Sequence, residues 1–160
     1  MLFRSCWDIG CGTGSVAVEM AYRCPDGHVY AYDKNAAAVL LTHENAQKFC
    51  CDHITAAEGE CPTILQDAPA PDKVFIGGSG GNLREIFSVI QQKNPAADIA
   101  ATAVSLETLS DAVQIFEQYC VNYQVTQIAV TRTKKRGAYT MFDAQNPVYL
   151  ITGGLKCAGS

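Results

Sequence analysis

No run of about 18 apolar residues occurs in the 160-residue chain, so its hydropathy predicts no transmembrane helix. The chain has no Cys-x-x-Cys pair, and its three histidines stand at no zinc-binding spacing from its eight cysteines. Residues 1–5, which precede the first predicted strand, are too few for a secretory signal. These absences indicate a cytoplasmic protein without a metal site, whose reduced thiols pack as small hydrophobic side chains.

Acidic residues are absent between Glu117 and Asp143. The four basic residues in this interval are Arg132, Lys134, Lys135 and Arg136. Because the net charge is −4 and the interval is +4, the rest of the chain carries −8. An acidic protein with one basic cluster is not typical of nucleic-acid binders. We expect Arg132, Lys134 and Arg136 to bind the carboxylates of a small polyanionic substrate; the alternative is a solvated loop.

Three glycines at every second position, Gly10, Gly12 and Gly14, follow a short apolar run that contains Asp8. Helix-compatible apolar spacing over residues 16–21 comes next, which predicts a strand, a tight turn and a helix. A plain turn, a dinucleotide site and an S-adenosylmethionine site all use such a turn. The dinucleotide fingerprint has its third glycine one residue later, at Ser15. Asp8 would repel a pyrophosphate but attract an α-ammonium group, which favours S-adenosylmethionine.

The pattern Asp-x-Gly-x-Gly-x-Gly at residues 8–14 resembles the opening of class I S-adenosylmethionine methyltransferases. Asp33 ends the next β-rich run, residues 28–33, where a carboxylate can accept hydrogen bonds from both ribose hydroxyls. Glu60, after the run at residues 53–58, matches the acid that these enzymes place near the adenine amine. We expect the cofactor to contact Asp8, Gly10, Cys11, Gly12, Thr13, Gly14, Ser15, Asp33, Lys34, Gly59, Glu60 and Cys61.

A second glycine-rich loop, residues 77–81, follows the apolar run at residues 73–76. Asn82 with Glu85 predicts a capping box for a helix through residue 92. Amino-directed methyltransferases usually carry an Asn/Asp-Pro-Pro-Tyr motif here, and its absence disfavours DNA-adenine and protein-glutamine substrates. A loop without side chains leaves room for a large flat substrate, although it could also be merely flexible. We expect the substrate to contact Gly77, Gly78, Ser79, Gly80 and Asn82.

The rest of the chain completes an alternation of strands and helices. Helices are predicted at residues 36–49 and 106–119, the second with Ser105 as its N-cap, and strands at residues 98–104, 123–133 and 139–152. Strand and helix thus alternate five times before two closing strands, within one domain of residues 1–160. This order predicts an α/β, Rossmann-like class I methyltransferase fold. Its seven-stranded sheet should be mostly parallel with an antiparallel last strand and helices on both faces.

Four segments, residues 8–15, 75–83, 104–109 and 146–153, together resemble the decarboxylating precorrin methyltransferases of cobalamin biosynthesis. The glycine loop and the Asn-Pro-Val-Tyr ending at residues 146–149 are the most specific of them. The family occurs as separate subunits or as the C-terminal half of a fused precorrin-6Y methyltransferase. The resemblance implies methylation of carbon 15 of precorrin-6B or cobalt-precorrin-6B, coupled to decarboxylation of an acetate side chain. It also implies a homo-oligomer, as a tetramer.

Family members usually begin with a helical segment that helps to cover the cofactor, whereas about six residues precede Trp7 here. We therefore expect either a piece of a longer, fused chain or a domain without part of its cofactor lid. Two other functions stay open: methylation of another small anionic molecule, and cofactor binding without turnover. No catalytic acid or base is predicted, because a sulfonium donor and an enamine carbon need in-line positioning more than a strong base.

Overall fold

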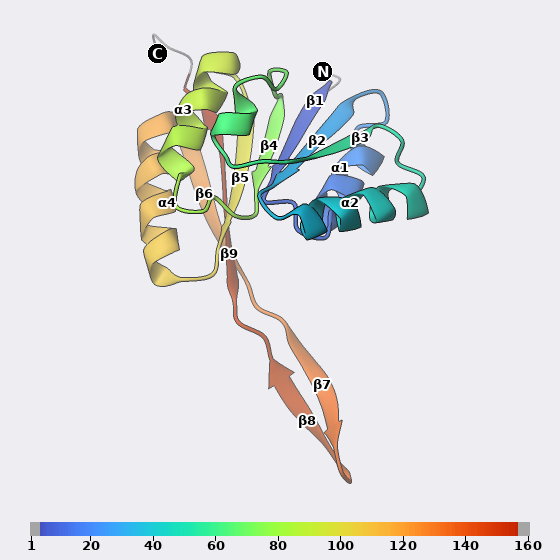
Figure 1. Ribbon diagram of the computed structural model, residues 1–160. Helices are drawn as coiled ribbons and strands as arrows, with labels where there is room; N and C mark the ends of the chain where they lie inside the picture. Colours follow the sequence, from blue (N-terminus) through green and yellow to red (C-terminus); the bar gives the residue numbers. More distant parts are fainter. Residues whose placement is uncertain (1–3, 157–160) are drawn as a thin grey trace.

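The computed structural model describes residues 4–156, and a seven-stranded sheet forms its centre (Figure 1). The strand order is β3-β2-β1-β4-β5-β9-β6. The strands are β1 (Ser5–Ile9), β2 (His28–Asp33), β3 (Ile54–Glu58), β4 (Lys73–Ile76), β5 (Asp98–Ala103), β6 (Cys120–Ile128) and β9 (Val148–Leu155). Only β9 runs against its neighbours β5 and β6. The predicted mostly parallel sheet with an antiparallel last strand is confirmed.

Helices cover both faces of the sheet (Figure 1). Helices α1 (Ser15–Arg23) and α2 (Ala36–Lys48) lie over one face, and α3 (Leu83–Lys93) and α4 (Leu106–Tyr119) lie over the other. Side chains alternate along a strand, so Trp7 and Ile9 enter the core beneath α3 and α4, whereas Cys6 joins the core beneath α1 and α2. The fivefold alternation was wrong at one place, because only a short 3-10 turn, η1 (Thr63–Leu65), follows β3.

The two predicted helix caps have different outcomes. Ser105 is the N-cap of α4, and its hydroxyl accepts a hydrogen bond from the Thr108 N–H at 3.2 Å, as predicted. Asn82 precedes α3 but makes no side-chain cap, so the predicted capping box with Glu85 is wrong. Its amide Nδ2 instead donates to the Cys61 carbonyl at 3.0 Å. This bond ties the loop after β4 to the loop after β3.

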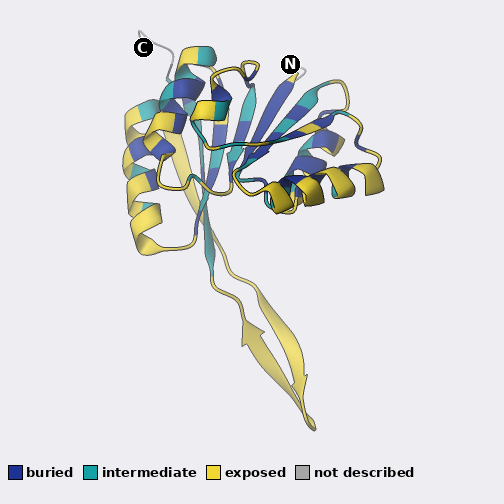
Figure 2. Ribbon diagram, in the orientation of Figure 1, coloured by how far each residue is buried: buried dark blue, intermediate teal, exposed yellow. Residues whose placement is uncertain are grey.

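The two closing strands were predicted too long. Each predicted strand is divided in two, and only one part belongs to the seven-stranded sheet. The other parts are β7 (Thr131–Arg136) and β8 (Tyr139–Ala144), which lie between β6 and β9 in the chain. These two strands pair with each other in a separate two-stranded sheet. We call residues 129–147 the arm, because they project from the body of the molecule (Figure 1). All residues of β7 and β8 are exposed (Figure 2).

The seven cysteines among residues 4–156 are free thiols. Five of them are buried, in agreement with the prediction that they pack as small hydrophobic side chains: Cys6, Cys11, Cys24, Cys51 and Cys120. Cys157 lies outside the described residues. Within residues 4–156, no helix has the length and apolar character that a membrane span requires.

Candidate cofactor and substrate site

The glycine turn after β1 is bonded to the end of β2. The Gly10 and Cys11 N–H groups both donate to the Tyr32 carbonyl, at 2.8 and 3.1 Å. The Gly12 N–H donates to the Asp33 Oδ2 at 3.0 Å. These bonds hold the turn beside the acid that ends β2, at the carboxyl edge of the parallel strands. Ligands of open α/β sheets bind at this edge.

Gly10 also brings the turn against the loop that follows β4. Its φ is +72°, a backbone conformation that residues other than glycine rarely adopt. A Cβ on Gly10 would lie 2.7 Å from the backbone nitrogen of Gly78. The Gly77 N–H donates to the Ile9 carbonyl at 2.8 Å and locks the same contact. The two glycine segments therefore form one continuous surface.

A pocket of about 370 Å³ opens beside this surface. Its lining residues are Ile9, Gly10, Tyr32, Asp33, Lys34, Gly59, Glu60, Cys61, Gly78, Ser79, Gly80 and Asn82. The volume lies in the usual range for small-molecule sites. Its charged side chains are Asp33, Glu60 and Lys34, so the lining carries one net negative charge and no arginine.

The lining suits S-adenosylmethionine better than a dinucleotide. The two Asp33 carboxylate oxygens accept the N–H groups of Gly12 and Asn35, each at 3.0 Å. A carboxylate has about four acceptor positions, so roughly two stay available for ribose hydroxyls. A net negative pocket attracts a sulfonium and an ammonium, whereas it repels a pyrophosphate. The residues present therefore fit the cofactor that the glycine pattern predicted.

Asp8 lies beneath the turn rather than in the pocket. Its side chain is fully buried, and neither carboxylate oxygen has a hydrogen-bond partner among the described residues. Burial raises the pKa of Asp8 to about 7; the backbone N–H of Ala17, which forms no hydrogen bond with the carboxylate by distance and angle, opposes the rise, and the charge of Asp33 adds to it. Asp8 is not among the lining residues of the pocket, so its contact with an α-ammonium group stays a prediction.

Comparisons with known proteins agree with this geometry. The family model described as "Precorrin methyltransferase domain" matches residues 3–153. The chain belongs to the precorrin methyltransferase family. A relative from Pyrobaculum calidifontis, named "Probable cobalt-precorrin-6B C(15)-methyltransferase (decarboxylating)", is 41% identical. That alignment covers 91% of this chain and 75% of the relative.

Solved structures of family members share the fold. The precorrin-6y C5,15-methyltransferase from Geobacter metallireducens has a TM-score of 0.84 and 37% identity. That match covers 96% of this chain and 81% of the other. The precorrin 8W decarboxylase from Methanobacterium thermoautotrophicum has a TM-score of 0.84 and 35% identity, covering 94% and 81%. A SAM-dependent O-methyltransferase from Thermotoga maritima, at 14% identity and a TM-score of 0.70, shares the fold alone.

The predicted site residues divide into two groups in this precorrin methyltransferase domain. The pocket brings together ten of them: Gly10, Asp33, Lys34, Gly59, Glu60, Cys61, Gly78, Ser79, Gly80 and Asn82. The others lie outside its lining: Asp8, Cys11, Gly12, Thr13, Gly14, Ser15, Gly77, Arg132, Lys134 and Arg136. Two turn residues of this second group make contacts within the fold: the Cys11 thiol lies 3.4 Å from the Thr42 hydroxyl, and the Thr13 carbonyl accepts a hydrogen bond from Asn45 Nδ2 at 2.8 Å. Their contacts with the cofactor stay predictions.

Two pocket residues were missed by the sequence analysis. Ile9 and Tyr32 are buried hydrophobic side chains that also line the pocket. Each immediately precedes a predicted contact, Gly10 and Asp33 respectively. Since residues at the carboxyl end of a strand can face the ligand as well as the core, their position near the strand ends was the available signal.

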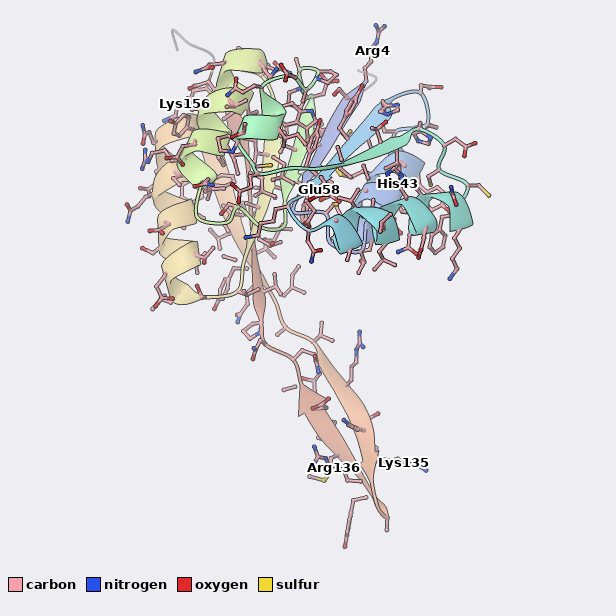
Figure 3. The ribbon with its side chains drawn as sticks, in the orientation of Figure 1. Arg4, His43, Glu58, Lys135, Arg136 and Lys156 are labelled. Carbon is pink, nitrogen blue, oxygen red and sulfur yellow. The ribbon has the colours of Figure 1, made fainter. Side chains whose placement is uncertain are left out.

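The arm's basic residues do not reach the pocket of their own chain. No residue of β7 or β8 is among the lining residues. Figure 3 shows Lys135 and Arg136 near the end of the arm, far from Glu58 at the end of β3. The expected position of the cluster, beside the mouth of the site, therefore does not hold within one copy of the chain.

Proposed function

We propose that this single-domain chain is an S-adenosylmethionine-dependent C-methyltransferase of cobalamin biosynthesis. It methylates carbon 15 of precorrin-6B or cobalt-precorrin-6B, and an acetate side chain of the tetrapyrrole is lost as carbon dioxide. The single observation that carries this proposal is the match of the precorrin methyltransferase model to residues 3–153. The acidic pocket, which suits a cationic methyl donor, supports it. Incubation with methyl-labelled donor and cobalt-precorrin-6B should move the label into the tetrapyrrole. Label that stays with the donor would contradict the proposal.

The residues of the site position the reactants. Asp33 holds the ribose, Glu60 lies within the same pocket for the adenine amine, and the loop at residues 77–81 leaves a flat opening beside them. S-adenosylmethionine supplies an activated methyl group. In-line placement of a nucleophilic carbon then accounts for much of the rate, so the pocket needs no strong base. Exclusion of water by Ile9 and Tyr32 strengthens the electrostatic contacts of the two acids.

Replacing Asp33 with alanine should weaken S-adenosylmethionine binding by roughly 1–3 kcal/mol, the value of hydrogen bonds to a charged group. Isothermal titration calorimetry measures the change. Glu58→Ala is the matched control, because Glu58 stands opposite Asp33 in the sheet register but is exposed and outside the pocket. The role of Asp33 would be rejected if both variants bound the cofactor like the unmodified protein.

We also propose that the arm assembles copies of the chain into an oligomer, consistent with the tetramer that the family resemblance implies. An isolated two-stranded hairpin is at best marginally stable in water. The arm also exposes large apolar side chains, since Phe142 is 84% and Tyr139 is 74% exposed. One face of the arm is nearly uncharged and holds Phe142 with Thr131, Thr133, Thr140 and Ala144. Burial of this face against another copy would stabilise both the arm and the oligomer.

Phe142→Ser should dissociate the oligomer, because it removes the largest apolar side chain of that face and adds a hydroxyl to be desolvated. Multi-angle light scattering at micromolar concentration should report an oligomer for the unmodified chain and a smaller species for the variant. Leu40→Ser is the control, since Leu40 is also an exposed apolar residue, but lies on α2, away from the arm. A monomer mass for the unmodified chain would contradict assembly.

A further inference from the structure

Within one copy, acids outnumber cations in the hollows where a polycarboxylate substrate would bind. The pocket lining has one net negative charge. A neighbouring hollow of about 330 Å³ between α3 and α4 shares Ser79 with it, and there Arg84 is accompanied by Glu85 and Asp111. Both hollows are thus acidic on balance. A tetrapyrrole with many carboxylates would be repelled from each of them unless positive charge came from elsewhere.

Positive charge is concentrated on one face of the arm. The register pairs Arg132 with Asp143, Lys134 with Met141 and Arg136 with Tyr139, so these three basic side chains alternate onto the same face. Lys135 lies on the opposite, nearly uncharged face (Figure 3). The arm is therefore two-sided. Its cationic face carries three basic residues and one acid, and we use this name for it below.

The arm starts at the carboxyl edge of the sheet, which is also the edge of the pocket, but it points away from the pocket of its own chain. Strands β6 and β1 run in the same direction, so the arm leaves from the carboxyl edge, where the pocket also opens. Figure 1 shows it extending outward from that edge rather than folding back over the site. An arm held in this way can meet the carboxyl edge of another copy. Outside the interval at residues 118–142 the chain carries −8, which attracts a cationic arm.

We propose that the cationic face of the arm completes the substrate site of a second copy of the chain. Arg132 and Arg136 pair with substrate carboxylates beside the partner's pocket, and Lys134 adds charge between them. Arginine suits this role because its guanidinium binds a carboxylate through two parallel hydrogen bonds. This inference rests on the proposed function, since it takes both the oligomer and the polycarboxylate tetrapyrrole from it. It goes beyond the proposed function because it makes each active site a composite of two chains.

Complementation between two defective variants tests the composite site. The arm variant is Arg132→Gln/Arg136→Gln, which keeps side-chain length and leaves the pocket intact. The pocket variant is Asp33→Ala/Glu60→Ala, which keeps the arm intact. Each alone should lose at least roughly 10-fold in kcat/KM with cobalt-precorrin-6B. Mixed oligomers, co-expressed with two tags and purified through both, should recover about a quarter of unmodified activity by random pairing of intact arms with intact pockets.

The controls make every outcome decisive. Lys135→Gln removes the same charge from the opposite face of the arm and should keep full activity. Arm variants should bind S-adenosylmethionine normally, which separates substrate positioning from misfolding. Mixed oligomers no more active than their parents would overturn the composite site, because an arm acting on its own chain gives no rescue. Full activity of the arm variant would overturn it as well.

Inactivity of the unmodified chain would instead count against the proposed function. The same preparations are therefore also titrated with uroporphyrin, a tetrapyrrole that bears many carboxylates, and binding is followed by fluorescence. Tight binding by the unmodified chain and by the pocket variant, whose arms are intact, but not by the arm variant, supports the role of the cationic face independently of turnover. No binding by the unmodified chain, or equally tight binding by the arm variant, overturns it.

Discussion

Gly10→Ala should abolish measurable cofactor binding and destabilise the fold by roughly 2–4 kcal/mol. Two physical effects combine at this position. A Cβ would stand 2.7 Å from the Gly78 nitrogen and 2.8 Å from its carbonyl oxygen, so backbone would have to shift. The φ of +72° adds left-handed strain. Because Gly10 and Gly78 both line the pocket, the displaced loop distorts the binding surface itself.

Gly12→Ala is the matched control for this prediction. Gly12 has a φ of +55° and shares the backbone strain, but a Cβ there meets nothing within 4 Å. It also lies outside the pocket lining. We expect this variant to lose only about 1–2 kcal/mol of stability and to keep cofactor binding. Urea unfolding and calorimetry measure the two properties. Equal loss of binding in both variants would show that strain, rather than the clash, decides.

Asp8→Asn should remove a pH dependence that the native fold carries. The pKa of Asp8 rises from the ordinary value of 3.8 to about 7 in the folded protein, chiefly through burial. Between these two values the folded chain holds a proton that the unfolded chain releases. The free energy of unfolding therefore falls as pH rises from about 4 to 7, by an amount on the order of 4 kcal/mol, and stays low above pH 7.

The asparagine variant stays neutral throughout this range. Its buried amide lacks partners, which offsets roughly 1–3 kcal/mol of the gain. We expect it to be more stable than the unmodified chain at pH 8 and no more stable at pH 4. Urea unfolding across pH 4 to 9 measures both curves. Asp26→Asn, in an exposed turn, should leave the pH dependence unchanged. Parallel curves for the Asp8 variant and the unmodified chain would contradict an ionised, unpartnered carboxylate at position 8.

Local patterns predicted much of the fold. The β-rich runs at residues 28–33 and 73–76 coincide with β2 and β4, because apolar runs bounded by turn residues have few alternatives. The capping box at Asn82 failed because a tertiary partner, the Cys61 carbonyl, takes its side chain. The arm could not be predicted, since β propensity does not reveal where a strand leaves one sheet and pairs in another.

The pocket residues could be predicted where the turn and the strand ends determine their position. They could not be predicted where the direction of a side chain determines whether it lines the pocket. Gly10 and Asp33 line the pocket because the turn and the strand end put them there. Asp8 does not, because strand alternation directs its side chain to the face beneath α1, beside buried Cys6. The sequence shows that Asp8 stands next to a ligand-binding motif, but the direction of its side chain depends on the pleat of β1, so its contact with the cofactor stays a prediction.

Mass spectrometry of the tetrapyrrole after incubation with cobalt-precorrin-6B and S-adenosylmethionine tests the central claim most directly. The proposed activity predicts one product that has gained a single methyl group and lost one carbon dioxide, with S-adenosylhomocysteine formed in equal amount. Gly10→Ala protein should give no product under the same conditions. An unchanged tetrapyrrole mass, from a chain that calorimetry shows to bind S-adenosylmethionine, would contradict the account.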